Sequence, residues 1–318
     1  MSQPVFAEKN VLFHLPPAPP RLESIEWGIL LAIVYSDIFD YPMTVDEIHR
    51  YMVEVQATPD QVREALFSGN LIPEFVSKHQ EFFSLAGRSE IIQLRARRSV
   101  CAKTKWNHAL KFGTLIAALP YVRMVAVTGA LALDNVERDA DLDFLIVTSP
   151  GRLWLCRAMT LLVVQMARIY KIEICPNYFL AENSLLIQEQ NLFTARELAQ
   201  MVPIFGWDTY LLMRRINTWV LDYLPNSAGP PVKAFPFLHR NRFPSDPARY
   251  SIETILGLPP GSSLESWEMN RKIRKLTPNF STGGEFEFNS MTCKGHLHGH
   301  GGNALRKFDE RVDRLLSS

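Results

Sequence analysis

The stretch TGALALDNVERDADLDFLIVT, residues 128–148, constrains the fold of this 318-residue chain more than any other segment. A glycine turn is followed by aspartates on alternate residues, Asp139, Asp141 and Asp143, and then by an apolar run. Because side chains alternate across a β-strand, Asp141 and Asp143 are expected to project together from one face, about 6 to 7 Å apart along the backbone. Carboxylates this close repel one another, so we expect a positive charge between them.

A divalent cation is the simplest source of that charge. Mg²⁺ commonly takes one or two protein carboxylates while phosphate oxygens and water complete its coordination, so Asp141 and Asp143 are the candidate metal ligands. The alternative is that they are solvated turn acids before an ordinary strand, which accounts for neither the preceding glycine turn nor the strand on each side. Asp139 is interpreted as a turn acid that accepts local hydrogen bonds, and the alternative is a helper acid beside the metal ligands.

The first part of the chain predicts a winged-helix domain over residues 23–87. Apolar residues recur at helical spacing up to Phe39, and Thr44 and Thr58 each stand where a helix cap is expected. Two short strands flank a polar turn at residues 78–80. The first 20 residues end in a proline cluster, and residues 1–22 are expected to form a poorly ordered leader.

Residues 88–224 predict a mixed α/β domain with a helical extension. A long basic helix is followed by a strand, the Gly129 turn, the strand that starts near Asp141, a helix and a third strand, and then by two more helices. Residues 225–318 are rich in proline at first and predict an irregular arm that ends in a C-terminal helix. The fold class is therefore α+β, with an N-terminal winged-helix domain, a mixed α/β domain and C-terminal helices.

The composition is that of an ordinary globular protein. Hydrophobic residues make up 47% of the chain, charged residues 21%, and the net charge is +1, which gives no overall attraction to nucleic acid or membrane. The four cysteines are widely spaced, no export signal is evident, and the two most apolar segments are too short or too charged to span a bilayer. We expect a cytoplasmic protein with no membrane segment.

The glycine turn and the aspartates resemble a known signature. Gly129, a spacer and Asp139-Ala140-Asp141-Leu142-Asp143-Phe144, between the strands RMVAVTG and FLIVT, are similar to the motif of the nucleotidyltransferase superfamily related to DNA polymerase β. The segments NLFTARELAQ and WVLDYLPN also resemble uncharacterised bacterial proteins of similar length.

The resemblance implies Mg²⁺-dependent transfer of a nucleoside monophosphate from an NTP to an unidentified acceptor, which could be a protein, a nucleic acid or a small molecule. Two Mg²⁺ ions are possible, and Mn²⁺ is a possible substitute. Asp141 and Asp143 would hold the metal, and the turn formed by Thr128, Gly129 and Ala130 would present backbone N–H groups to the phosphates. Ala130 departs from the family, which usually has serine or glycine there.

The third carboxylate of the family comes from a later strand. Glu173, in Ile172-Glu173-Ile174, is the candidate catalytic acid, and the alternative is a surface acid on an edge strand. Asn177 on the same strand would be a poorer ligand, and a site built with it would bind nucleotide without turnover. Arg152, with Arg157 further along the same helix, is a candidate phosphate contact, although an arginine on a solvated helix face is commoner.

Other charged segments give weaker indications. The third helix of the winged helix, PDQVREALFSG, holds one arginine against two acids, so we do not expect it to bind DNA. The basic segment 88–111 is a candidate polyanion surface, but a solvated helix face is favoured. Three histidines beside a cysteine could bind metal adventitiously, but a mobile glycine-rich loop is favoured. These four residues are Cys293, His296, His298 and His300.

Three functions remain open on the sequence alone. The leading one is a nucleotidyltransferase enzyme, supported by the intact Asp141 and Asp143 pair. A second is a degenerate domain that binds nucleotide without catalysis, supported by Ala130 and the uncertain third carboxylate. A third is a winged-helix DNA-binding regulator, which the poor charge of residues 59–69 disfavours.

Overall fold

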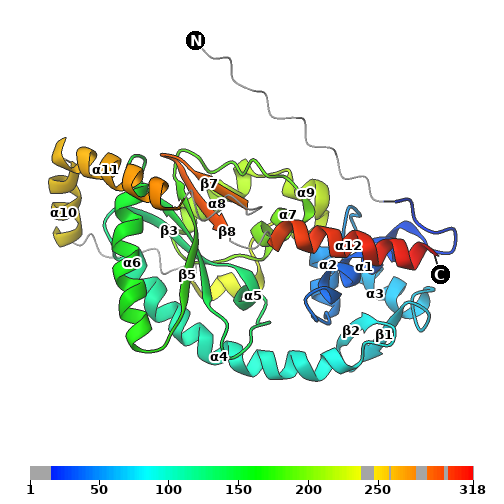
Figure 1. The fold of residues 1–318 in the computed structure, drawn as a ribbon. Helices are drawn as coiled ribbons and strands as arrows, with labels where there is room; N and C mark the ends of the chain where they lie inside the picture. The colour runs from blue at the N-terminus through cyan, green and yellow to red at the C-terminus, as the bar shows by residue number, and fades with distance from the viewer. Residues whose placement is uncertain (1–15, 238–246, 258, 277–284, 297–299, 318) are drawn as a thin grey trace, which may run out of the picture.

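The computed structural model describes residues 16–237, 247–257, 259–276, 285–296 and 300–317. Over these residues the chain has an α+β fold, in which N-terminal helices and a hairpin lie beside a mixed six-stranded sheet flanked by helices (Figure 1). The predicted fold class is confirmed. Residues 1–15 of the predicted leader lie outside the described part of the chain.

The N-terminal domain is built around α1 (Ser24–Asp37). This helix is apolar on nearly all sides, as a helix enclosed by a core must be, and every residue from Glu26 to Asp37 is buried. Thr44 and Thr58 cap the next two helices, as predicted, and both caps are capping boxes, completed by Glu47 and Gln61. The remaining elements are α2 (Val45–Tyr51), α3 (Pro59–Ser68) and the antiparallel strands β1 (Val76–His79) and β2 (Phe82–Leu85). Three helices followed by a hairpin is the order that the sequence predicted.

The long helix α4 (Glu90–Ala117) joins this domain to the sheet. Among the basic residues of segment 88–111, Arg97, Lys103 and Lys111 are exposed, as the predicted solvated face requires, whereas four others make contacts within the molecule. Their partners lie in the N-terminal domain and in the loop that leads to Asp141. The contacts are Arg88 with Asp37 and Asp40, Arg95 with Glu47, Arg98 with Glu137, and Lys105 with the carbonyl of Ala140.

The sheet has the strand order β6-β3-β4-β5-β8-β7. Only β4 and β5 pair in parallel, as a crossover through the helix α6 requires, and all the other neighbours are antiparallel. The strands are β3 (Val122–Val127), β4 (Leu142–Thr148), β5 (Ile174–Ala181), β6 (Val202–Phe205), β7 (Glu285–Phe288) and β8 (Thr292–His296). The remaining helices are α5 (Gly129–Ala132), α6 (Leu153–Ile169), α7 (Leu192–Gln200), α8 (Trp207–Ile216), α9 (Val220–Tyr223), α10 (Pro247–Gly257), α11 (Pro259–Leu276) and α12 (His300–Ser317), with 3-10 turns η1 (Pro225–Ser227) and η2 (Val232–Phe237).

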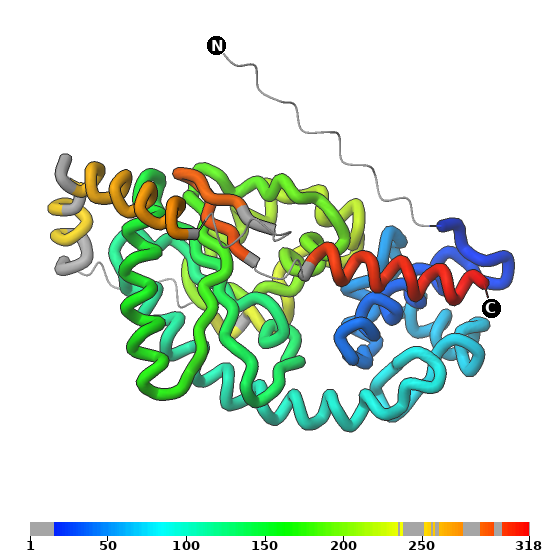
Figure 2. The backbone as a smooth tube through the Cα atoms, in the orientation of Figure 1, coloured from blue at the N-terminus to red at the C-terminus, as the bar shows by residue number. Residues whose placement is uncertain are grey.

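The two faces of the sheet belong to different cores. On β4, Leu142, Phe144 and Ile146 face a core shared with α4 and α6. Leu145 and Val147 face the other core, which continues through α7 and α8 into the N-terminal domain. The helix α12 contacts both α1 and α7 and runs along the N-terminal domain (Figures 1 and 2). The N-terminal domain and the sheet are therefore joined by packing as well as by α4.

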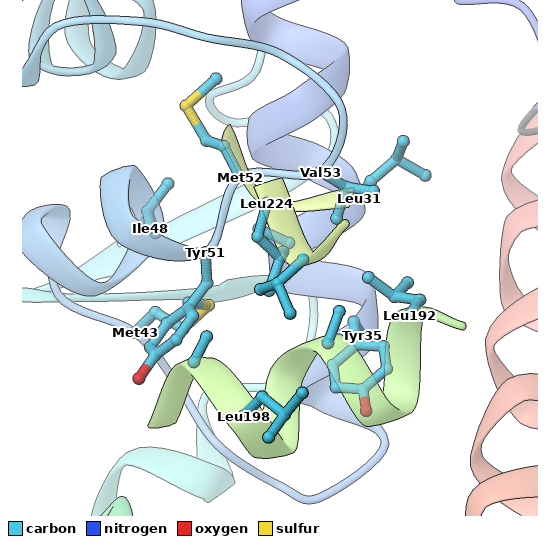
Figure 3. Close-up of a cluster of buried hydrophobic side chains, with 14 of the residues drawn as sticks. Leu31, Tyr35, Met43, Ile48, Tyr51, Met52, Val53, Leu192, Leu198 and Leu224 are labelled. Atoms are coloured by element: carbon cyan, nitrogen blue, oxygen red, sulfur yellow. The ribbon is translucent and has the colours of Figure 1, made fainter. Parts of the chain in front are cut away.

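Figure 3 shows where that packing is made. Side chains from the N-terminal domain, among them Tyr35 and Tyr51, lie against Leu192 and Leu198 of α7 and against Leu224. Leu224 and Met43 have no exposed surface, and Leu31 is 1% exposed. The N-terminal domain thus lacks a closed core of its own, and α7 completes it.

The structure has more regular elements in the C-terminal part than the sequence indicated. Two strands, β7 and β8, extend the sheet from within residues 225–318, which were predicted as an irregular arm. Between the two helices predicted after the third strand, the structure has the edge strand β6, which contains Pro203, and an edge strand tolerates proline. Within the described residues, no helix is both long and apolar enough to cross a membrane.

Candidate metal centre

Asp141 and Asp143 converge at the start of β4. Asp141 is exposed and precedes the strand, whereas Asp143 is partly buried and lies opposite Cys175 on the parallel neighbour β5. One ligand atom from each of these three residues lies within 4.8 Å of the other two. Among the described residues, this is the only group of three histidine, cysteine or acidic side chains that comes together in this way.

The third position of the group holds a thiol and, beside it, an amide. The strand β5 has one more residue than β4 between the partners of Asp143 and Leu145, so both Cys175 and Asn177 reach the aspartates. The Asn177 amide nitrogen donates to Asp143, and the Cys175 thiol donates to the Asn177 oxygen over 2.5 Å. The third protein group is therefore neutral.

Glu173, the predicted catalytic acid, lies outside this group. Its side chain is 60% exposed, and its carboxylate lies 3.8 Å from the guanidinium Nε of Arg168 at the end of α6. Glu173 lies just before β5, and its backbone carbonyl accepts the N–H of Leu142 at the start of β4 at 2.9 Å. The structure thus brings Cys175, rather than Glu173, to the aspartate pair.

The predicted glycine turn contacts Asp143 directly. Gly129 begins α5 with a φ of +62°, a left-handed conformation that glycine adopts without strain. A Cβ atom at this position would lie 2.5 Å from the Asp143 Oδ2 atom. The N–H of Thr128 donates to the Asp143 carbonyl at 3.1 Å, while Ala130 is exposed in the next position. The turn therefore requires glycine for both its backbone conformation and its closeness to Asp143.

Glu197 of α7 is a further acid that the sequence analysis missed. Its Oε2 atom accepts the N–H of Gly129 at 3.3 Å, and its Oε1 atom accepts the side-chain N–H of Gln200 at 2.5 Å. Burial raises the pKa of Glu197 to about 7, against the opposing effects of the Gly129 N–H and of Arg196. The segment NLFTARELAQ indicates only a helix, so no local signal pointed to this contact.

The electrostatics of the site favour a bound cation. Burial, then the negative charge of Asp141 and then that of Glu197, raises the pKa of Asp143 from its usual 3.8 to about 8, and the Asn177 hydrogen bond opposes the shift only in part. Burial, and after it the charges of Asp143 and Asp141, raises the pKa of Cys175 to about 12. The thiol is therefore protonated at neutral pH. Ionisation of the two aspartates is unfavourable because of burial and mutual repulsion, and a positive charge between them would offset this cost.

These donors fit one hard divalent cation. Two carboxylates supply the oxygen ligands that Mg²⁺ or Mn²⁺ prefers, and water and phosphate oxygens can fill the other positions. A protonated thiol is a poor ligand for Mg²⁺, and the Asn177 amide is already engaged at both ends. This group does not contain the third carboxylate that the resemblance implies, so it lacks a ligand that would bind a second ion firmly.

Arg152 is not brought to the aspartates. It occupies the position just before α6, beyond the far end of β4. Seven strand residues at about 3.3 Å each separate it from Asp141 by roughly 20 Å. Its guanidinium hydrogen-bonds Ser262 and lies 5.4 Å from the ring centre of Tyr121. The first backbone N–H groups of α6 are accepted by the buried Glu265, so this helix end is already occupied by an acid of the protein itself.

The predicted cysteine–histidine tract is only partly described. Cys293 is buried in β8, where burial raises the pKa of its thiol. His298 and the side chains of His296 and His300 lie outside the described part of the chain.

Comparison with known proteins gives no family assignment. No protein-family model matches the chain, and no significant match is found among curated proteins or among solved structures.

Proposed function

We propose that this chain binds a nucleoside triphosphate as its Mg²⁺ complex and transfers the nucleoside monophosphate to an unidentified acceptor. The observation that carries the proposal is the convergence of Asp141 and Asp143, together with the contact of Asp143 with the glycine turn at Gly129. A pair of hard ligands beside a backbone turn suits a metal-bound phosphate chain better than it suits an isolated ion, because Mg²⁺ usually keeps several non-protein ligands.

The reaction would be an in-line displacement at the α-phosphorus. The acceptor oxygen forms the new bond to phosphorus, the bond from phosphorus to the bridging oxygen of the β-phosphate breaks, and pyrophosphate leaves with the electron pair. When bound, Mg²⁺ would supply positive charge that stabilises the phosphate oxygens. Asp141 and Asp143 would hold the phosphates in place through the bound ion. The proton of the acceptor would pass to water, since the group contains no further carboxylate to accept it.

The test is transfer of label from an NTP carrying a labelled α-phosphate. Wild-type protein with Mg²⁺ should release pyrophosphate and label an acceptor from a panel of protein, nucleic acid and small molecules. The double variant Asp141→Asn and Asp143→Asn should lose the activity. Asp139→Asn removes a neighbouring exposed charge and is the matched control, which should remain active. Activity that survives in the double variant would refute the assignment.

A second candidate is a domain that binds nucleotide without turnover. It is favoured by the observation that Cys175 and Asn177 stand where the resemblance implies a third carboxylate. Calorimetry would then show Mg²⁺-dependent NTP binding that the double variant loses, with no pyrophosphate release from wild-type protein across the acceptor panel.

The structure gives little support to a DNA-binding regulator. In α3 the exposed Arg63 stands beside Asp60 and Glu64, and on α4 the acids Glu47 and Glu137 hold Arg95 and Arg98. These contacts reduce the number of free arginine side chains on the two helices that could neutralise phosphate.

A further inference from the structure

Two consecutive residues of α7 contact different parts of the molecule. Arg196 turns into the N-terminal domain, where its side chain is 3% exposed. Its guanidinium carbon lies 3.8 Å from the ring centre of Tyr51 and 5.1 Å from that of Tyr35, and its Nη2 atom donates to the Ser36 hydroxyl at 3.3 Å. Within the described residues, the Nε and Nη1 atoms of Arg196 have no hydrogen-bond partner, so the aromatic faces hold this buried charge.

Glu197 turns the other way, toward the sheet. Its carboxylate is held at one oxygen by the Gly129 N–H and at the other by Gln200. Gly129 in turn touches the carboxylate of Asp143. A continuous series of contacts therefore runs from Tyr51 of the N-terminal domain through α7 to a metal ligand.

We infer that Glu197 is a positioning residue of the cation site and that Arg196 ties its position to the N-terminal domain. Adjacent residues on a helix share one rigid backbone, so a shift or rotation of α7 that moves Arg196 also moves Glu197. Glu197 acts in two ways. It holds the Gly129 N–H in place, and its negative charge attracts the cation in addition to the attraction exerted by Asp143. Whatever binds or distorts the N-terminal domain at α1 and α2 thereby alters the cation site. The inference rests on the cation site of the proposed function and does not depend on nucleotidyl transfer.

The shared core gives the link its stiffness. The apolar face of α7 is buried together with the N-terminal domain, as Figure 3 shows for Leu192 and Leu198, so α7 follows that domain. The carbonyls at the end of α7 are also bound by arginines, Leu198 by Arg214 and Ala199 by Arg50 of α2. Arg50 is a second contact from the N-terminal domain to the same helix.

The experiment uses Mn²⁺ alone, with free Mn²⁺ measured by electron paramagnetic resonance, and hydrogen exchange of the peptide that contains Gly129. Glu197→Ala should weaken Mn²⁺ binding about tenfold and speed exchange of the Gly129 amide, because both the charge and the acceptor are lost. Arg196→Lys keeps the charge but loses the planar group on Tyr51, and should produce both effects more weakly. Glu64→Ala and Arg215→Lys, at exposed positions, are the matched controls.

The outcomes separate the inference from the proposed function. If Arg196→Lys is folded and leaves both Mn²⁺ affinity and Gly129 exchange at wild-type values, the link to the N-terminal domain is overturned. If Glu197→Ala is folded and leaves both Mn²⁺ affinity and Gly129 exchange at wild-type values, the positioning role of Glu197 is overturned. Should Arg196→Lys fail to fold, Ser36→Ala removes its hydrogen-bond partner and takes its place. Failure of wild-type protein to bind Mn²⁺ would overturn the proposed function, and the exchange measurements would still decide whether Arg196 controls the turn.

Discussion

Replacing Asp143 by asparagine should make the metal-free protein more stable at pH 8 while removing its response to Mg²⁺. Burial and the charges of Asp141 and Glu197 raise the pKa of Asp143 to about 8, so the folded protein resists its ionisation. Asparagine has nearly the same shape and no charge, so it removes this cost. A residue that lowers stability where it stands is expected at a binding site.

The sign and size follow from the two pKa values. Because the pKa is higher in the folded than in the unfolded chain, the favourable contribution of protonated Asp143 is complete below pH 3.8 and is lost as the pH rises through about 8. At about 1.4 kcal/mol for each pKa unit, the upper limit of the loss is about 6 kcal/mol. Water entry and relaxation reduce such values, and we expect about 2 to 3 kcal/mol of unfolding free energy to be lost between pH 5 and pH 8.

Urea unfolding followed by tryptophan fluorescence would measure the effect at both pH values. The unfolding free energy of wild-type protein should fall from pH 5 to pH 8 and rise again on addition of Mg²⁺. That of Asp143→Asn should fall less and should not change on addition of Mg²⁺. Asp139→Asn, which removes an exposed charge nearby, should behave as wild type. Equal losses in wild type and Asp143→Asn would refute the view that Asp143 is strained without a cation.

Three further substitutions test other parts of the structure. Cys175→Asp adds a carboxylate opposite Asp143 and should tighten Mg²⁺ binding about tenfold by calorimetry; unchanged affinity would show that this position is not at the ion. Gly129→Ala should lower the unfolding free energy by at least about 1 kcal/mol, because φ is +62° and the added methyl group meets Asp143, and a neutral result in urea would contradict this. Glu265→Ala leaves two N–H groups of α6 without acceptors and should cost about 1 to 3 kcal/mol in the same assay, with Glu265→Gln less affected.

Features set by neighbouring residues were predictable from the sequence. The helix caps at Thr44 and Thr58 and the α1 core helix depend on contacts within a few residues, and the structure has them. The Gly129 turn was also predicted, and its contact with Asp143 follows from the antiparallel pairing of the strands on either side of it.

The remaining residues of the site depend on pairings that the sequence does not record. The resemblance favoured Glu173 as an acid between apolar neighbours on a later strand. Which residue of β5 faces Asp143 is set by the length and docking of α6, and that residue is Cys175. Glu197 reaches Gly129 across 68 residues of chain, so no spacing rule could have found it. Likewise, the acidic partners of Arg95 and Arg98 lie in two other segments, so the sequence of α4 alone does not indicate these ion pairs.

The alternation of side chains along β4 explains why the N-terminal domain affects the cation site. Residues of one parity, such as Phe144 and Ile146, point into the core beneath α4 and α6, while Leu145 and Val147 point into the core that α7 shares with the N-terminal domain. Asp143 has the parity of Leu145, so its carboxylate emerges on the side of the N-terminal domain. A cation bound there lies on the face that α7 covers, and so the packing of α7 against Tyr35 and Tyr51 forms part of the site's architecture. Removal of the N-terminal domain would therefore expose the apolar face of α7 and leave Glu197 without support, which is why the two parts of this chain are expected to function only together.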